Sequence, residues 1–337
     1  MSPPPPGQPY RPGPPPGWSP APGMFGAVHK PGAIPLRPLS LGDLYDGAFR
    51  IIRFNPKATV GSAVLVAAVA MAVPVLVTAV LTWTIGLAYD PSSGSGDDVD
   101  NEAISYGLLG VGVLLQALGL VFVTGMVVHV VSAAAVGRRL TLGQAWSATH
   151  GRRWRLVGLA AVLGLTTTLG IAAFAVLWVV TAVVAPLVVA ILVIVATVVL
   201  FFTLLFWFWI RVYYLAVPPM MIEGVGVFAS IARGYRLSRG AFWRLFGIGL
   251  LTWLIAAIAG QMLAVPFTIA GELGGLAAGD DLYLFVTVLG TALAQVTSTA
   301  FVAPFTSAVT SLQYVDQRIR KEAYDVELMR RAGILES

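Results

Sequence analysis

The chain has 337 residues, of which 57% are hydrophobic and only 11% are charged, and its mean hydropathy is +0.83. Soluble globular proteins carry about 25% charged residues, so this composition excludes a soluble domain and indicates that lipid surrounds most of the protein. The absence of cysteine excludes disulfides and thiolate metal sites. The net charge of +5 points, in such a protein, to anionic lipid headgroups rather than to nucleic acid.

The first 38 residues hold 14 of the 22 prolines and almost no aliphatic side chain before Ile34. We expect residues 1–38 to form a disordered cytoplasmic tail with polyproline II character. Such a tail either recruits a protein partner through an aromatic groove or serves only as a tether, and the sequence leaves both open.

Long apolar runs follow this tail. A helix needs about 20 apolar residues to cross a bilayer, and the third run is about twice as long as the others. We expect it to form two spans with a short turn at Ala185–Pro186. The runs are Ala58–Ala88, Ile104–Val136, Leu156–Val217, Leu245–Gly271 and Leu282–Leu312.

The charges between the runs predict the topology. The segment Gly137–Arg155 contains five arginines and no acid, whereas Asp90–Glu102 and Gly271–Asp281 contain acids and no basic residue. Basic loops stay in the cytoplasm. The sequence therefore predicts an all-α integral membrane protein with six transmembrane helices and both termini cytoplasmic, in a bacterial plasma membrane.

An internal repeat precedes the predicted hairpins. Leu39–Gly61 aligns without gaps on Val225–Gly247, and Leu140–Gly158 shares the ends of the pattern although it is four residues shorter. We interpret each copy as a cytoplasmic amphipathic helix, capped by Ser40 or Thr141 in two of them, that lies on the inner membrane face before a transmembrane hairpin. The membrane domain of residues 39–312 then consists of repeats at about 39–136, 140–217 and 225–312, and a cytoplasmic C-terminal helix occupies 313–337.

Arginine and tryptophan recur at the ends of these segments. Arginines there reach anionic headgroups and fix topology, and tryptophans prefer the interface. The expected anchors are Arg50, Arg53, Arg138, Arg139, Arg153, Arg155, Trp154, Arg236, Arg239, Trp243 and Arg244.

Two further sets of polar residues are candidates for a role inside or near the membrane. Arg211, at the end of the fourth span, either snorkels to the headgroups or forms a structural ion pair with Glu223. The intramembrane polar positions either join helices by hydrogen bonds or line a translocation path. These positions are Gln116, His129, Gln261 and Gln295.

One stretch of the chain carries a family resemblance. In "RVYYLAVPPMMIEGVGVFASIARGYRLSRGAFWRLFG" (residues 211–247), Arg211, Pro218, Glu223 and the Phe242–Arg244 triplet stand at characteristic positions. The chain, from about Pro35 to Leu328, resembles the membrane domain of glycerophosphoryl diester phosphodiesterases and related uncharacterised actinobacterial multi-pass proteins. The arginine-rich, lysine-poor composition, typical of a GC-rich bacterial genome, fits such an origin.

The resemblance does not extend to the catalytic domain. In that family the phosphodiesterase is a separate barrel of about 250 residues, for which this chain has no room. The three histidines of this chain also lack acidic neighbours at the spacing of metal ligands. We therefore expect no catalytic residue, no metal and no cofactor.

The sequence favours a non-catalytic inner-membrane protein of the cell envelope that organises lipids or recruits partners through its basic helices and proline-rich tail. A transporter or channel for a lipid or small solute is the alternative, and a membrane-embedded enzyme is a third. A lipid-sized cavity lined by the four intramembrane polar positions favours transport, whereas a tightly packed bundle favours a scaffold. The oligomeric state is left open.

Overall fold

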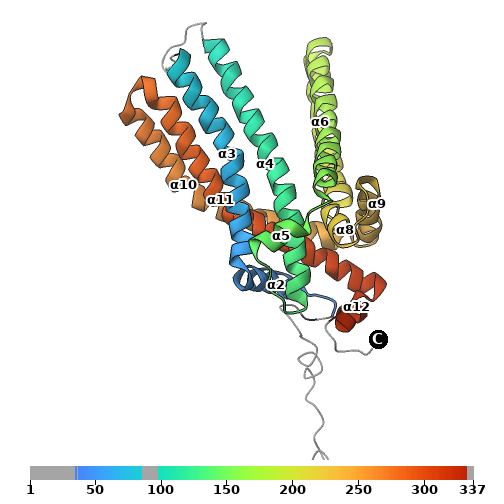
Figure 1. Cartoon of the computed structure of the whole chain (residues 1–337). Helices are drawn as coiled ribbons and strands as arrows, with labels where there is room; N and C mark the ends of the chain where they lie inside the picture. The colour runs from blue at the N-terminus through green and yellow to red at the C-terminus, as the bar shows by residue number, and fades with distance from the viewer. Residues whose placement is uncertain (1–34, 36, 86–97, 332–337) are drawn as a thin grey trace, which may run out of the picture.

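The computed structural model describes residue 35 and residues 37–85 and 98–331, so the proline-rich tail lies almost wholly outside the described residues. Within them every regular element is helical, which confirms the all-α class (Figure 1). In chain order the elements are α2 (Leu41–Phe54), α3 (Pro56–Ile85), α4 (Asp98–Ala135), α5 (Leu142–Ala148), α6 (Arg153–Val184), α7 (Leu187–Phe208), the π-helical turn η1 (Trp209–Tyr213), α8 (Val217–Ile222), α9 (Val227–Ser238), α10 (Phe242–Ala278), α11 (Asp280–Glu322) and α12 (Tyr324–Arg331).

Six of the described helices are long and apolar enough to cross a membrane. They are α3, α4, α6, α7 with its continuation to Ile222, α10 and α11. The long third run is indeed two helices, since α6 ends at Val184 and α7 begins at Leu187. Pro186 has no backbone N–H and its ring disfavours a helical Ala185, so the helix ends there. These are the features of a multi-pass membrane protein.

A shorter helix precedes α3, α6 and α10 at the positions that the sequence predicts. The side chains of Ser40 and Thr141 each accept a hydrogen bond from the backbone N–H three residues later. In return, the side chains of Asp43 and Gln144 accept a hydrogen bond from the backbone N–H of the cap residue. These two capping boxes satisfy N–H groups that a helix start leaves unpaired. The third helix, α9, starts after Gly226 without a side-chain cap.

Four of the long helices, α3, α4, α10 and α11, form a bundle that stands on one side of the molecule (Figure 1). Small residues allow close approach between α10 and α11. A Cβ built on Gly290 would overlap the Cα of Gly271, and one built on Gly275 would lie 2.7 Å from the Thr287 hydroxyl. Such small-residue seams are the usual means of tight packing between membrane helices, which gain nothing from burying apolar surface away from lipid.

The remaining long helices form a separate hairpin, which we call the α6–α7 arm. In Figure 1, α6 stands apart from the bundle, and the two meet only towards the end where the short helices gather; we call this end the base. The rest of the protein buries 56% of the most apolar stretch of α4, against 0% for α6 and 6% for α7. Away from the start of α6, where Leu156, Leu159 and Leu163 are buried, the arm is therefore covered little by the rest of the protein.

Candidate functional site

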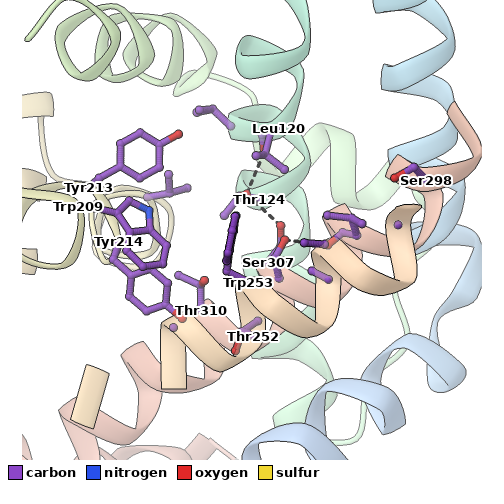
Figure 2. Close-up of a pocket in the computed structure, with 18 of the residues that line it drawn as sticks. Leu120, Thr124, Trp209, Tyr213, Tyr214, Thr252, Trp253, Ser298, Ser307 and Thr310 are labelled. Atoms are coloured by element: carbon purple, nitrogen blue, oxygen red, sulfur yellow. Dashed lines mark hydrogen bonds between the residues drawn. The ribbon is translucent and has the colours of Figure 1, made fainter. Parts of the chain in front are cut away.

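A cavity of about 510 Å³ lies where the end of the arm meets the bundle. We call it the central cavity. The aromatic side chains of η1 and the adjacent Tyr214 form one wall, and residues of α4, α10 and α11 form the opposite wall (Figure 2). Its volume falls within the roughly 300–1,000 Å³ typical of small-molecule sites.

The aromatic wall depends on the π-helical turn. π-helical turns are rare and occur frequently at functional sites. Here the turn places Trp209, Tyr213 and Tyr214 together on the cavity, with the rings of Trp209 and Tyr214 edge to face at 5.3 Å between centroids. Gly249 on α10 makes room for them, because even a Cβ at this position would already lie 3.4 Å from both rings.

Hydroxyl groups are concentrated on the wall formed by the bundle. Ser298, Thr306 and Thr310 recur along α11 at multiples of four residues and line the cavity. Thr124 on α4 and Ser307 on α11 also line it and hydrogen-bond to each other at 2.9 Å (Figure 2). This wall offers neutral hydroxyl oxygens in otherwise apolar surroundings.

The charge of the lining limits what the cavity can bind. None of the described residues that line it is an acid, a lysine, an arginine or a histidine. An ion buried without a partner costs several kcal/mol, so the cavity fits an apolar chain or a neutral hydroxyl, ester or sugar group. The arrangement provides no nucleophile with a neighbouring base.

The helix α2 reaches the wall of the cavity through a tyrosine. The Tyr45 hydroxyl lies 3.1 Å from the hydroxyl of Thr252, which lines the cavity. Burial raises the pKa of Tyr45 above its ordinary value, and the hydrogen bond with Thr252 offsets part of this effect. Tyr45 therefore acts as a neutral hydroxyl that joins α2 to α10.

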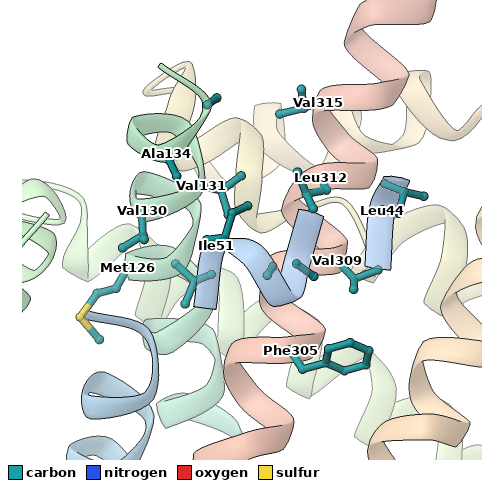
Figure 3. Close-up of a cluster of buried hydrophobic side chains, with 14 of the residues drawn as sticks. Leu44, Ile51, Met126, Val130, Val131, Ala134, Phe305, Val309, Leu312 and Val315 are labelled. Carbon is teal, nitrogen blue, oxygen red and sulfur yellow. The ribbon is translucent and has the colours of Figure 1, made fainter. Parts of the chain in front are cut away.

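The apolar face of α2 packs against protein rather than against a lipid surface. Leu44 and Ile51 are fully buried in a cluster with Val131 of α4 and with Val309 and Leu312 of α11 (Figure 3). This corrects the expectation of a helix lying on the membrane. The periodicity of α2 identifies a buried face, but periodicity alone does not distinguish lipid from a neighbouring helix.

The four predicted intramembrane polar positions do not gather at one site. Gln261 lines the cavity, whereas the Gln116 side chain donates to the Thr299 hydroxyl at 2.7 Å and so joins α4 to α11. Gln295 is exposed on α11, and the Nε2 atom of His129 is buried with no hydrogen-bond partner among the described residues. Of the two alternatives, Gln116 therefore fits the joining of helices, and of the four positions only Gln261 lines the central cavity.

The candidate ion pair between Arg211 and Glu223, one of the two alternatives for Arg211, does not form in the structure. Glu223 pairs with Arg233 at 3.0 Å and accepts a hydrogen bond from the Tyr314 hydroxyl. The guanidinium of Arg211 lies instead over the rings of Tyr235 and Phe242, at 5.6 and 5.5 Å from their centroids. Glu223, which caps the end of α8, thus finds its partners on α9 and α11 rather than on the preceding span.

Arg244 was expected to reach headgroups, but it makes contacts within the protein. Its guanidinium pairs with Asp316 at 2.8 Å and donates to the carbonyl oxygen of Leu39 at 2.6 Å. Asp316 also pairs with Arg320 and accepts from the Leu39 N–H, and its side chain is only 2% exposed. This network joins the start of α2 to α10 and α11, and it needs Arg244 because a buried carboxylate requires a cation.

The other expected anchors fall into two groups. Arg155 donates to the Gly224 carbonyl and Arg153 donates to the Trp146 carbonyl, so both connect parts of the base. The exposed side chains, Arg155 again among them, are Arg50, Arg53, Arg138, Arg139, Trp154, Arg155, Arg236, Arg239 and Trp243, and the guanidinium of Arg139 lies over the Phe54 ring. Trp154 and Trp243 are 86% and 79% exposed.

The hydroxyl wall has a signal in the sequence. Ser298, Thr306 and Thr310 stand at i, i+8 and i+12, which places them on one face of a helix. Small residues follow a similar face of α10 at Gly249, Ala256 and Gly260. The aromatic wall had no comparable signal, because it depends on an irregular turn of the backbone.

Nothing among the described residues offers a metal site, since no group of three or more His, Asp or Glu side chains is close enough to hold an ion. Comparison of the chain with protein-family models, with curated proteins and with solved structures finds no match. A functional assignment must therefore rest on the central cavity and its surroundings.

Proposed function

We propose that the protein is a non-catalytic multi-pass protein of a bacterial plasma membrane that holds part of a membrane lipid in its central cavity. The observation that carries the proposal is the cavity itself: about 510 Å³, aromatic on one wall, hydroxyl-rich on the other, and without a charged residue in its described lining. An acyl chain fits the apolar part, and an ester or hydroxyl fits the Ser and Thr side chains.

Charge supports the orientation that we propose, with both termini in the cytoplasm. The exposed arginines Arg53, Arg138 and Arg239 stand at helix ends near the short helices α2, α5 and α9. Basic residues favour the cytoplasmic side. The recurrence of a short helix before each pair of long helices supports an origin from three repeats.

The family resemblance enters the proposal as well. We infer a relation to the membrane domain of glycerophosphoryl diester phosphodiesterases, without their catalytic barrel, and a role in the cell envelope. The proline-rich tail would then recruit a protein partner to a lipid-binding membrane domain.

Filling the cavity tests the proposal. In Ala257→Trp, an indole occupies space between α10 and the aromatic wall, and we expect the lipid that co-purifies with the wild-type protein to be lost. Ala172→Trp is the matched control, because Ala172 lies exposed on α6, away from the cavity. Native mass spectrometry of both variants measures bound lipid, and equal lipid in Ala257→Trp and wild type contradicts the proposal.

A transporter of the same lipid is the second candidate. The exposure of the α6–α7 arm favours it. The arm contacts the rest of the protein at the base and has little packing against it elsewhere. Reconstitution into liposomes with fluorescent lipids separates the two candidates. A protein that only binds the lipid leaves the rate of lipid exchange between leaflets unchanged. A transporter accelerates this exchange, and the Ala257→Trp variant loses the acceleration.

A further inference from the structure

A second hollow lies outside the central cavity, between α3, α4 and α5. It has a volume of about 610 Å³, and we call it the α5 groove. Apart from Ser62, its lining is apolar or glycine. The residues are Ser62, Leu65, Val66, Val69, Ala70 and Val73 from α3, Leu115, Gly119, Phe122 and Met126 from α4, and Leu142, Gly143 and Trp146 from α5.

The groove follows from the way in which α3 and α4 approach each other. They meet closely at Gly119, where a Cβ would lie 2.5 Å from the Val66 side chain. On the outer side, Leu65 and Val69 remain 55% and 63% exposed. The groove residues that belong to α3 and α4 lie within two helical segments that are long and apolar enough to span a membrane. The medium around an exposed apolar groove at this depth is lipid, so its occupant is an acyl chain.

The end of the groove at α5 has a different character. Trp146 forms part of its lining and packs against Phe122, with 6.3 Å between the ring centroids. The guanidinium of Arg153 lies over the Trp146 ring, 4.0 Å from its centroid, and donates to the Trp146 carbonyl at 3.0 Å. A tryptophan with an arginine stacked on it marks the boundary between hydrocarbon and headgroup.

The chain around α5 is basic throughout. The segment 137–155 contains α5, carries Arg138, Arg139, Arg152, Arg153 and Arg155, and has no acid. Arg138 is exposed and stands four residues before Leu142, which lines the groove. An apolar groove that ends at Trp146 and Arg153, within a basic segment of the chain, complements a molecule with a hydrocarbon chain attached to a phosphate.

We propose that the α5 groove binds one anionic phospholipid, with an acyl chain between α3 and α4 and the phosphate beside Arg138 and Arg153. This site goes beyond the lipid proposed for the central cavity. The central cavity has no charged lining residue and selects a neutral group, whereas the α5 groove selects an anionic headgroup. The two sites lie on different faces of α4, with Phe122 and Met126 on one and Thr124 on the other.

Filling the groove tests whether it binds the acyl chain of a lipid. Gly143 lines the groove and a Cβ there meets nothing within 4 Å, so in Gly143→Leu the added side chain starts in open space at the groove wall. Gly164 on α6 is equally free of neighbours and lies outside both sites, which makes Gly164→Leu the matched control. With delipidated protein and phosphatidylglycerol as the probe, we expect native mass spectrometry to show loss of one bound lipid in Gly143→Leu only.

The charge part is tested by Arg138→Gln. We expect the affinity for phosphatidylglycerol to fall about fivefold, the factor that corresponds to one basic residue near an anionic surface. The affinity for phosphatidylcholine should not change. Arg236→Gln, at an exposed arginine on α9, which contributes no residue to the groove, is the control and should leave both affinities unchanged.

Three results overturn the proposal. Equal binding of phosphatidylglycerol and phosphatidylcholine to the wild type removes the anionic selectivity. Unchanged binding in Gly143→Leu removes the chain site. If inorganic phosphate displaces phosphatidylglycerol at concentrations comparable to that of the lipid, the site binds anions in general and does not need an acyl chain. Ala257→Trp leaves this site intact, so failure here is distinct from failure of the lipid in the central cavity.

Discussion

The α10–α11 and α6–α7 hairpins are both long and apolar, yet they pack in opposite ways. In α10–α11 the backbones touch at Gly271 and Gly290, and further glycines continue the seam. In α6–α7 the contact depends on larger side chains, with the ring of Phe201 against those of Phe174 and Trp178. Gly164 and Gly170 of α6 have no neighbour within 4 Å of a built Cβ.

The difference shows that apolar composition inserts a helix into a membrane without determining what it packs against. Close approach needs small residues that face each other in register, and α10 and α11 have them whereas the α6–α7 arm does not. The arm therefore stands away from the bundle and joins it at the base. The central cavity lies at this junction, where η1 brings three aromatic rings to the bundle.

The strongest test of this contrast is Gly290→Val. Its Cβ would overlap the Gly271 backbone, which has no side chain that can move aside. We expect destabilisation beyond the 1–3 kcal/mol or so of ordinary overpacking, measured as loss of monodisperse protein or a large fall in the melting temperature. Gly170→Val on α6 is the control, and a similar loss there would mean that the arm is as tightly packed as the bundle.

The next effect in size concerns the base of the bundle. Asp316→Ala leaves Arg244 and Arg320 beside a cavity where a buried carboxylate stood, and removing one partner of a buried ion pair costs about 3–5 kcal/mol. We expect a clear fall in melting temperature and easier proteolysis near Leu39. Glu327→Ala, which removes an exposed partner of Arg318 at 3.7 Å, should have little effect. Equal effects of the two substitutions would contradict the network.

A smaller effect is expected within the arm. Phe201→Ala removes ring contacts worth about 0.5–1.5 kcal/mol beyond area burial, and the loss should stay local because the arm has few other contacts. Hydrogen exchange should increase in α6 and α7 and remain unchanged in α10 and α11. Increased exchange in the bundle would show that arm and bundle unfold as one unit.

The sequence was sufficient for features that depend on neighbouring residues. The break at Pro186 and the caps at Ser40 and Thr141 follow from local chemistry, and the structure has each of them. The last span does continue as a helix, but the single helix predicted over residues 313–337 is interrupted: α11 ends at Glu322, Ala323 takes a left-handed conformation, and α12 begins at Tyr324.

Contacts between distant residues were not predictable in the same way. Arg244 and the Leu39 carbonyl are 205 positions apart, and Glu223 and Tyr314 are 91 apart. An arginine near a membrane carries the same local signal whether it binds a headgroup or a buried carboxylate. Only the packing of α11 against α2 and α9 distinguishes the two, and a single sequence does not contain that information.

The most direct test of the account is an electron-microscopy map of the wild-type protein in nanodiscs of native lipid. We predict elongated non-protein density in the central cavity, between the Trp209 ring and the Thr124–Ser307 pair, with the α6–α7 arm apart from the bundle. A cavity closed by α8 packed directly on α10, with no such density, would contradict the claim that this protein holds a lipid there.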